Sequence, residues 1–263
     1  MFFKKLNPTT NENTIMLPAH LSPTQKLKSS GSFFSYLGIL CFLFLWTENC
    51  FGSDFFIGQE SYREKNYKKA IEIWQPLANN GNMRAQNGLG AMFFFGRGVQ
   101  QDYQLALQWY TLAAKQNYPL AQNNIGWMYD NGLGVKKNYK TAVHWYSLAA
   151  EQGDAVSQNN LGWLYDKGNG VTQNYQTAFK WYKRSSEQGW PVAQFNLGWL
   201  YSKGHGVDKD LVRAYMWWHN SGTLGYDHAR KHKRLLEKEL KPVALAKAKY
   251  LARECSIKKY KEC

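Results

Sequence analysis

The sequence predicts an all-α fold, an α/α solenoid of helix-turn-helix repeats that are each 36 residues long. Three series of residues recur at this interval. A fixed period of this length is typical of solenoids, whose units bury their apolar faces only against their neighbours. The series are the tryptophans Trp109, Trp145, Trp181 and Trp217, the glycines Gly90, Gly126, Gly162 and Gly198, and the Gly-Val pairs that begin at Gly98, Gly134, Gly170 and Gly206.

Each repeat begins with a helix, as the segment after Asn138 illustrates. Asn and Asp are favoured helix N-caps because the side-chain oxygen accepts a backbone N–H that has no partner within the helix. The apolar residues between Tyr139 and Ala150 fall on one helical face, and Gly153 ends the helix. The same cap position is held by Asn66, Asp102, Asn174 and Asp210. The tryptophans that we expect to be largely buried between paired helices are Trp109, Trp145 and Trp181.

The second helix of this repeat is predicted from Ala155 to Gly168. Leu161 and Tyr165 are expected to face the core, and Gly162 is expected to let a neighbouring helix backbone approach closely. The Gly-x-Gly-Val turn that follows leads to the next Asn or Asp cap. Each unit is therefore predicted to be a helical hairpin.

The first 52 residues contain the one strongly apolar run, at 33–46, which Lys26 and Lys28 precede. A membrane span needs about 20 apolar residues, so this shorter run favours a signal peptide that is cleaved after Gly52. An uncleaved membrane anchor, or a translation start at Met16, stays open. We divide the chain into an N-terminal segment (1–52), a solenoid (53–222) and basic C-terminal capping helices (223–263).

Three strings carry a family resemblance: AQNNIGWMYDNGLGV (121–135), SQNNLGWLYDKGNGV (157–171) and AQFNLGWLYSKGHGV (193–207). With the Ala-x-x-Trp-Tyr block that follows each, they resemble the Sel-one-like repeats, relatives of the tetratricopeptide repeats. The resemblance implies a right-handed superhelical solenoid and protein–protein adaptor work in an exported bacterial protein, without enzymatic activity. Some secreted members carry a cysteine pair in every repeat, but this chain has no cysteine between Cys50 and Cys255. Activities of that subgroup are therefore not carried over.

No residues predict a catalytic, cofactor or metal site. The glycine-rich turns follow helices rather than strands, so they do not fit a dinucleotide-binding motif. His228 and His232 are spaced i, i+4 and could present two nitrogens to a metal, but their Lys- and Arg-rich surroundings favour solvated side chains.

Two rows of polar residues are candidates for partner binding. The amides Gln158, Asn160 and their equivalents are identical between repeats, which favours a structural hydrogen-bond ladder over a peptide-binding row. A stripe on the first helices varies between repeats, and we expect it to contact a partner unless it is an ordinary solvated face. The predicted contact residues are Lys140, His144, Lys180, Lys183, Met216 and His219.

The formal net charge of +14, half of it within 226–263, favours an acidic protein or peptide partner. Nucleic acid is not expected, and a membrane only through an uncleaved N-terminal segment. Cys255 and Cys263 predict one disulfide in an exported chain, with two free thiols as the alternative. The sequence thus predicts a periplasmic or secreted interaction scaffold, with a role at a host cell left open. The alternatives are a binding module for cell-wall glycan or peptide, and a regulator of an envelope enzyme.

Overall fold

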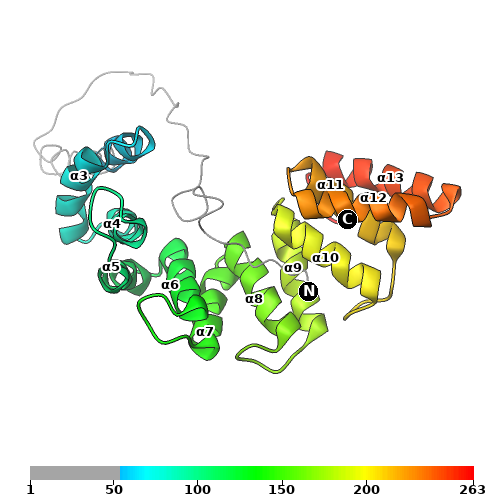
Figure 1. Cartoon of the computed structure of the whole chain (residues 1–263), viewed down its shortest axis with the longest axis horizontal. Helices are drawn as coiled ribbons and strands as arrows, with labels where there is room; N and C mark the ends of the chain where they lie inside the picture. Colours follow the sequence, from blue (N-terminus) through cyan, green and yellow to red (C-terminus); the bar gives the residue numbers. More distant parts are fainter. Residues whose placement is uncertain (1–53) are drawn as a thin grey trace, which may run out of the picture. The chain divides into compact units, whose positions relative to one another are not determined.

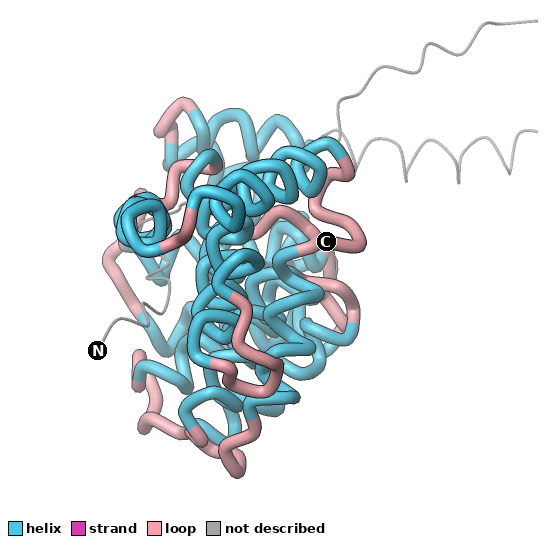
Figure 2. The backbone as a smooth tube through the Cα atoms, turned by 90° about the vertical axis from the view of Figure 1, so that its right-hand side faces the viewer, coloured by secondary structure: helices cyan, strands magenta, loops and turns pink. Residues whose placement is uncertain are grey.

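The computed structural model describes residues 54–263, and this part of the chain is helical throughout, with no strand (Figure 2). The all-α prediction is therefore confirmed. The apolar run at 33–46 and the predicted cleavage after Gly52 lie outside the described residues. Between residues 54 and 263, no helix has the length and apolar character needed to cross a membrane.

The described chain forms two compact units, residues 54–121 and 122–263, and the boundary between them falls within α6 (Figure 1). The first unit begins with a helix at 54–63, followed by α3 (Tyr67–Asn79), α4 (Met83–Phe95), α5 (Tyr103–Lys115) and the start of α6 (Pro119–Asn131). The second continues through α7 (Tyr139–Glu151), α8 (Ala155–Lys167), α9 (Tyr175–Ser186), α10 (Pro191–Lys203), α11 (Leu211–Thr223), α12 (Asp227–Glu239) and α13 (Pro242–Ile257).

The predicted caps delimit the helices as expected. In each first helix, the cap side chain accepts a hydrogen bond from the backbone N–H three residues later, at 2.8 to 3.3 Å. The caps are Asn66, Asp102, Asn138, Asn174 and Asp210. Gly153 follows α7 with φ of +97°, and Asn117 takes the same left-handed conformation after α5. Local sequence therefore fixes where each hairpin turns.

The aromatic core differs from the prediction. Trp109, Trp145 and Trp181 are only half-buried, whereas the tyrosine that follows each of them is at most 1% exposed. Tyr146 lies four residues after buried Ala142, at the centre of the core face, and Trp145 lies about 100° away from it. The buried tyrosines are Tyr110, Tyr146 and Tyr182. Trp74 and Trp218 hold the same position in the outer repeats and are also buried.

The recurring glycines make room chiefly for these rings. A Cβ on Gly162 would stand 2.9 Å from Cδ1 of Tyr182, and 3.3 Å from the Ala178 carbonyl oxygen. The expected approach of a helix backbone is therefore present, but the ring is closer. At the turn after α8, Gly170 has φ of +75°, and its Cβ would stand 2.5 Å from the carbonyl carbon of Tyr139. The turn thus packs directly on the start of α7.

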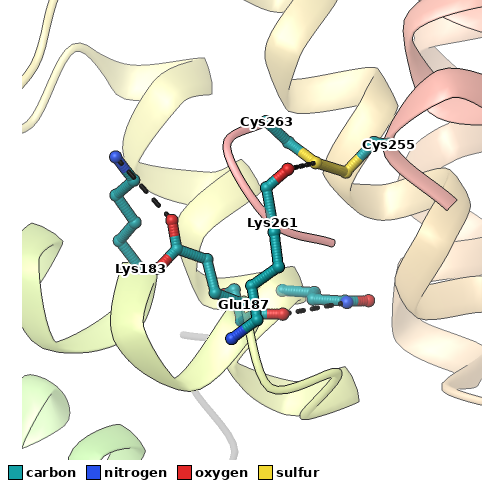
Figure 3. The surroundings of a disulfide bond; sticks show 7 residues. Lys183, Glu187, Cys255, Lys261 and Cys263 are labelled. Carbon is teal, nitrogen blue, oxygen red and sulfur yellow. Dashed lines mark hydrogen bonds and ion pairs between the residues drawn. A yellow bond between two sulfur atoms is a disulfide. The ribbon is translucent and has the colours of Figure 1, made fainter. Parts of the chain in front are cut away.

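The C-terminal helix α13 packs against α11 (Figure 1). Ala252 and Cys255 share a buried cluster with Met216 and Trp217 of α11. Cys255 and Cys263 are joined by a disulfide, with their Cα atoms 5.4 Å apart. Figure 3 shows this disulfide and the short tail that it closes, which lies beside the end of α9.

Candidate protein-binding surface

Four of the predicted contact residues lie exposed on two first helices. Lys140 and His144 are one turn apart on α7, and Lys180 and Lys183 are one turn apart on α9. The repeat brings them to equivalent positions, because His144 and Lys180 are 36 residues apart. We call Lys140, His144, Lys180 and Lys183 the basic face. It lies wholly within the second unit.

Half-buried tryptophan rings adjoin the basic face. The His144 ring packs edge-on against Trp145, with ring centroids 5.4 Å apart. The Arg184 guanidinium lies 4.8 Å from the centroid of Trp181. Trp181 also packs against the buried cluster formed by α7 and α8. The surface therefore combines positive charge with partly exposed aromatic area, the two features that anchor charged peptides.

The charges of the basic face are only partly compensated. The Lys183 Nζ atom lies 3.8 Å from a Glu187 carboxylate oxygen, and both side chains remain partly exposed (Figure 3). Lys140 and Lys180 form no ion pair with another residue between 54 and 263. An exposed i, i+4 pair contributes only about 0.3–0.5 kcal/mol, so a partner's carboxylate can compete for Lys183.

The structure removes Met216 from the predicted contact residues. Met216 is 1% exposed, because α13 covers this face of α11 and packs Ala252 and Cys255 against it. The same helix leaves His219 half-buried. Burial lowers the pKa of His219, Lys233 lowers it further, Glu237 opposes this and Lys249 adds to it. His219 therefore faces α12 and α13 rather than the basic face.

The buried amides form a structural ladder. Gln158 donates from Nε2 to the Ala150 carbonyl at 3.0 Å, and its Oε1 accepts from Gln188 Nε2 at 2.9 Å. The same pairing joins Gln116 to Gln86 and Gln152 to Gln122. Sequence reasoning missed the donor glutamines, although Gln116, Gln152 and Gln188 also recur every 36 residues. A peptide could reach these amides only by breaking the ladder.

The histidine pair of α12 is neither solvated nor arranged for a metal. His232 Nδ1 lies 2.8 Å from the His228 carbonyl oxygen, and its ring packs against Phe195 and Trp218 with centroids 5.1 and 5.0 Å away. Within the described chain, no group of three or more His, Cys, Asp or Glu side chains is placed to hold a metal ion. The aromatic neighbours come from α10 and α11, which the basic sequence of α12 alone did not reveal.

Comparison with known proteins places this architecture. The chain matches the model of the Sel1 repeat at residues 55–82, 84–118, 119–154, 155–190 and 191–226. Each match begins with the second helix of one hairpin and ends after the first helix of the next. Among proteins with curated functions, none matches the chain.

Two solved structures are similar to this chain. One is a protective antigen present in uropathogenic Escherichia coli strains, with a TM-score of 0.67 and 29% identity over 79% of this chain. The match spans only 46% of that longer protein. The other is a Sel1 repeat protein from Oxalobacter formigenes, with a TM-score of 0.62 and 35% identity over 68% of this chain and 73% of that one. The chain therefore belongs to the Sel1 repeat family, whose members are typically non-catalytic scaffolds for protein–protein interactions.

Proposed function

We propose that this protein is a non-enzymatic adaptor of the bacterial envelope or secreted fraction, which binds an acidic protein or peptide through the basic face. One observation carries the proposal. The buried positions of the first helices stay nearly constant between repeats, whereas exposed Lys140, His144, Lys180 and Lys183 replace one another with different side chains. Variation confined to an exposed stripe is what partner recognition requires, because the core beneath it already has a structural role.

The chemistry of the basic face supports an acidic ligand. Lys140 and Lys180 carry charge that no described carboxylate neutralises, and Trp145 and Trp181 offer apolar area beside it. Complementary charge speeds association and selects the partner, while partly buried aromatic rings supply most of the contact energy. An acidic segment with one or two apolar side chains fits both features.

The location rests on the N-terminal segment and on a relative. The apolar run at 33–46 with its preceding lysines supports export. One relative is described as a protective antigen of pathogenic strains, which supports a role in contact with a host.

Crosslinking followed by affinity measurement tests this proposal. A photo-crosslinking amino acid at His144 identifies the partner in the native organism, and the purified partner is then titrated against the full chain. Lys140→Glu with Lys180→Glu should weaken binding about tenfold and flatten its salt dependence, since both lysines are exposed and contribute by charge.

The matched control is Lys231→Glu with Lys238→Glu, two exposed lysines of α12. Lys233 is a poor control because it pairs with Glu237 at 3.3 Å. A control that loses binding, while the basic-face variant binds normally, would move the contact to the C-terminal helices and defeat the proposal.

The half-exposed rings of Trp145 and Trp181 favour a second candidate, the binding of cell-wall glycan by stacking. Titration with soluble peptidoglycan fragments should then quench tryptophan fluorescence in the native chain. Trp145→Phe with Trp181→Phe should abolish that response. An unchanged fluorescence at saturating fragment removes this candidate.

A further inference from the structure

Helix α13 has two apolar faces. Its inner face packs on the solenoid through Ala248, Ala252 and Cys255, which are at most 2% exposed. Its outer face carries Val243, Tyr250 and Ile257, which are 84%, 62% and 64% exposed. We call Val243, Tyr250 and Ile257 the outer seam. Sequence reasoning predicted an amphipathic helix here, but the helix is apolar on opposite sides.

The spacing of the outer seam is that of a helix-packing surface. The three residues are seven apart, so they line up along one side of the helix, about 21 Å from first to last. At 100° per residue, Tyr250 lies nearly opposite Ala248 and Ala252. The last element of a solenoid is expected to have a polar outer face for solubility. Three large apolar side chains in line, each more than 60% exposed, depart from that rule and mark an interaction site.

The charges beside the outer seam indicate what covers it. Lys247 and Arg253 flank Tyr250 at about 60° on either side, and Lys249 and Lys258 lie somewhat further round. Glu254 is the one carboxylate of α13 near the seam, and it is half-buried. The seam is therefore an apolar line between two rows of positive charge. A complementary surface has an apolar line between two rows of negative charge.

We propose that the outer seam of α13 binds an amphipathic helix of a partner protein whose apolar line is flanked by Asp and Glu. A second copy of this chain would bring Lys247 and Arg253 against like charges, which disfavours self-association through this face. A membrane requires an apolar face at least about 100° wide, whereas the seam is one residue wide. Heptad spacing and lysine flanks together fit a helical partner, since charges beside a coiled-coil seam select the partner.

This site is separate from the basic face and does not depend on the function proposed for it. The seam lies on the side of α13 that points away from α11, whereas Lys140 and Lys180 belong to α7 and α9. The two surfaces can therefore be disabled independently.

Peptide binding to the full chain tests the proposal. The probe is a fluorescein-labelled peptide of about three heptads, with Leu at the two seam positions of each heptad and Glu at the flanking positions. A matched peptide has Lys at the flanking positions. Anisotropy titrations at low and at physiological salt should show binding of the Glu peptide, weakened by salt, and no binding of the Lys peptide.

Variants identify the surface. Val243→Ser with Ile257→Ser should weaken binding of the Glu peptide at least tenfold, and circular dichroism should show an unchanged fold because both side chains are exposed. Lys247→Glu with Arg253→Glu should reverse the preference, so that the Lys peptide binds instead. Lys140→Glu with Lys180→Glu should leave the affinity unchanged.

Three results would overturn the proposal. The first is a Glu peptide that does not bind, or that binds equally to the seam variants. The second is a homodimer in sedimentation analysis that the Val243→Ser, Ile257→Ser variant dissociates, which would assign the seam to a second copy. The third is binding to phosphatidylglycerol vesicles that the same variant abolishes while peptide binding is absent, which would assign it to a membrane.

Discussion

The ring of Tyr146 occupies the space where Gly126 would carry a side chain. A Cβ on Gly126 would stand 2.7 Å from Cδ1 and 2.8 Å from Cε1 of that ring. Tyr146 belongs to α7 and Gly126 to α6, so the contact joins successive helices. The same relationship recurs between Gly90 and Tyr110, and between Gly162 and Tyr182. Each repeat is thus fastened to the next by an aromatic ring lying on a glycine.

Gly126→Ala should destabilise the protein. The added methyl group collides with a ring that is fully buried and cannot turn away, and overpacking of this kind costs about 1–3 kcal/mol. The gain in helix propensity from Gly to Ala, about 1 kcal/mol, offsets part of this cost. Urea unfolding followed by circular dichroism measures the difference. The control is Gly90→Ala in the first unit, which should behave in the same way; two opposite results would show that the ring contact is not the cause.

Tyr146→Ala should cost more stability than Trp145→Ala, although tryptophan is the larger residue. Tyr146 is fully buried, and truncation of a buried large aromatic ring costs about 3–5 kcal/mol. Trp145 is half-buried, so its truncation should cost roughly half as much in proportion to the apolar area lost. Thermal and urea unfolding of both variants check the order. A larger loss for Trp145→Ala would contradict the assignment of the core.

Leu224→Gln should stabilise the last repeat. Residue 224 stands 36 after Gln188, and a leucine there leaves the buried Oε1 of Gln194 without a hydrogen-bond donor. A glutamine can donate to it as Gln188 does to Gln158, with a gain of about 0.5–1.5 kcal/mol. The converse change, Gln188→Leu, should cost about 1–3 kcal/mol by leaving Gln158 Oε1 without its donor. Unfolding curves that move the same way for both variants would contradict the ladder.

Asp154→Asn should raise stability more at pH 7 than at pH 4. Burial raises the pKa of the Asp154 carboxyl, although its hydrogen bonds from Ser157 oppose the shift. The folded state therefore holds this proton more tightly than the unfolded state, so the contribution to stability is full below the unfolded pKa and is lost as the pH rises through the folded pKa. Asparagine keeps the N-cap of α8 without a charge. Melting temperatures from pH 4 to pH 7 should show the variant gaining on the native protein as pH rises, and a constant difference would refute the cause.

Reduction of the Cys255–Cys263 disulfide should loosen the C-terminal tail. The bond closes a loop with a sequence separation of 8, for which chain entropy gives about 2–3 kcal/mol as an upper bound. Melting temperature with and without reductant, together with hydrogen exchange at the Tyr260 amide, measures the effect. Cys263→Ala removes the bond without changing buried Cys255, and its melting temperature should not respond to reductant. Free labelling of both thiols in the native protein before reduction would contradict the bond.

The sequence predicted the hairpins because their limits are set locally. Asn138 caps its helix with its own side chain, and Gly153 ends it through its own backbone angle. The choice between Trp145 and Tyr146 as the buried ring was wrong because adjacent residues recur with the same period. Their separation depends on the direction of the core, about 100° between neighbours.

The candidate surface was only partly predictable for a different reason. Lys140 and Lys180 are exposed because nothing from their own hairpins covers them, and periodicity reveals that. Met216 occupies the same register, but α13 buries it through Cys255, a contact between residues 39 positions apart. A helix that follows the last repeat has no counterpart within the repeats, so no internal comparison could reveal where it packs.

The packing of α13 on α11 also gives the basic face a closed end. Beyond Lys183 a ligand meets Tyr260, whose ring lies 3.2 Å from the position of a Cβ on Gly189, and then the disulfide-closed tail. A ligand that follows the exposed stripe from α7 to α9 cannot continue onto α11, where Met216 and Trp217 are already covered. The tail therefore acts as an end stop, which sets both the greatest length of a bound segment and the register in which it lies.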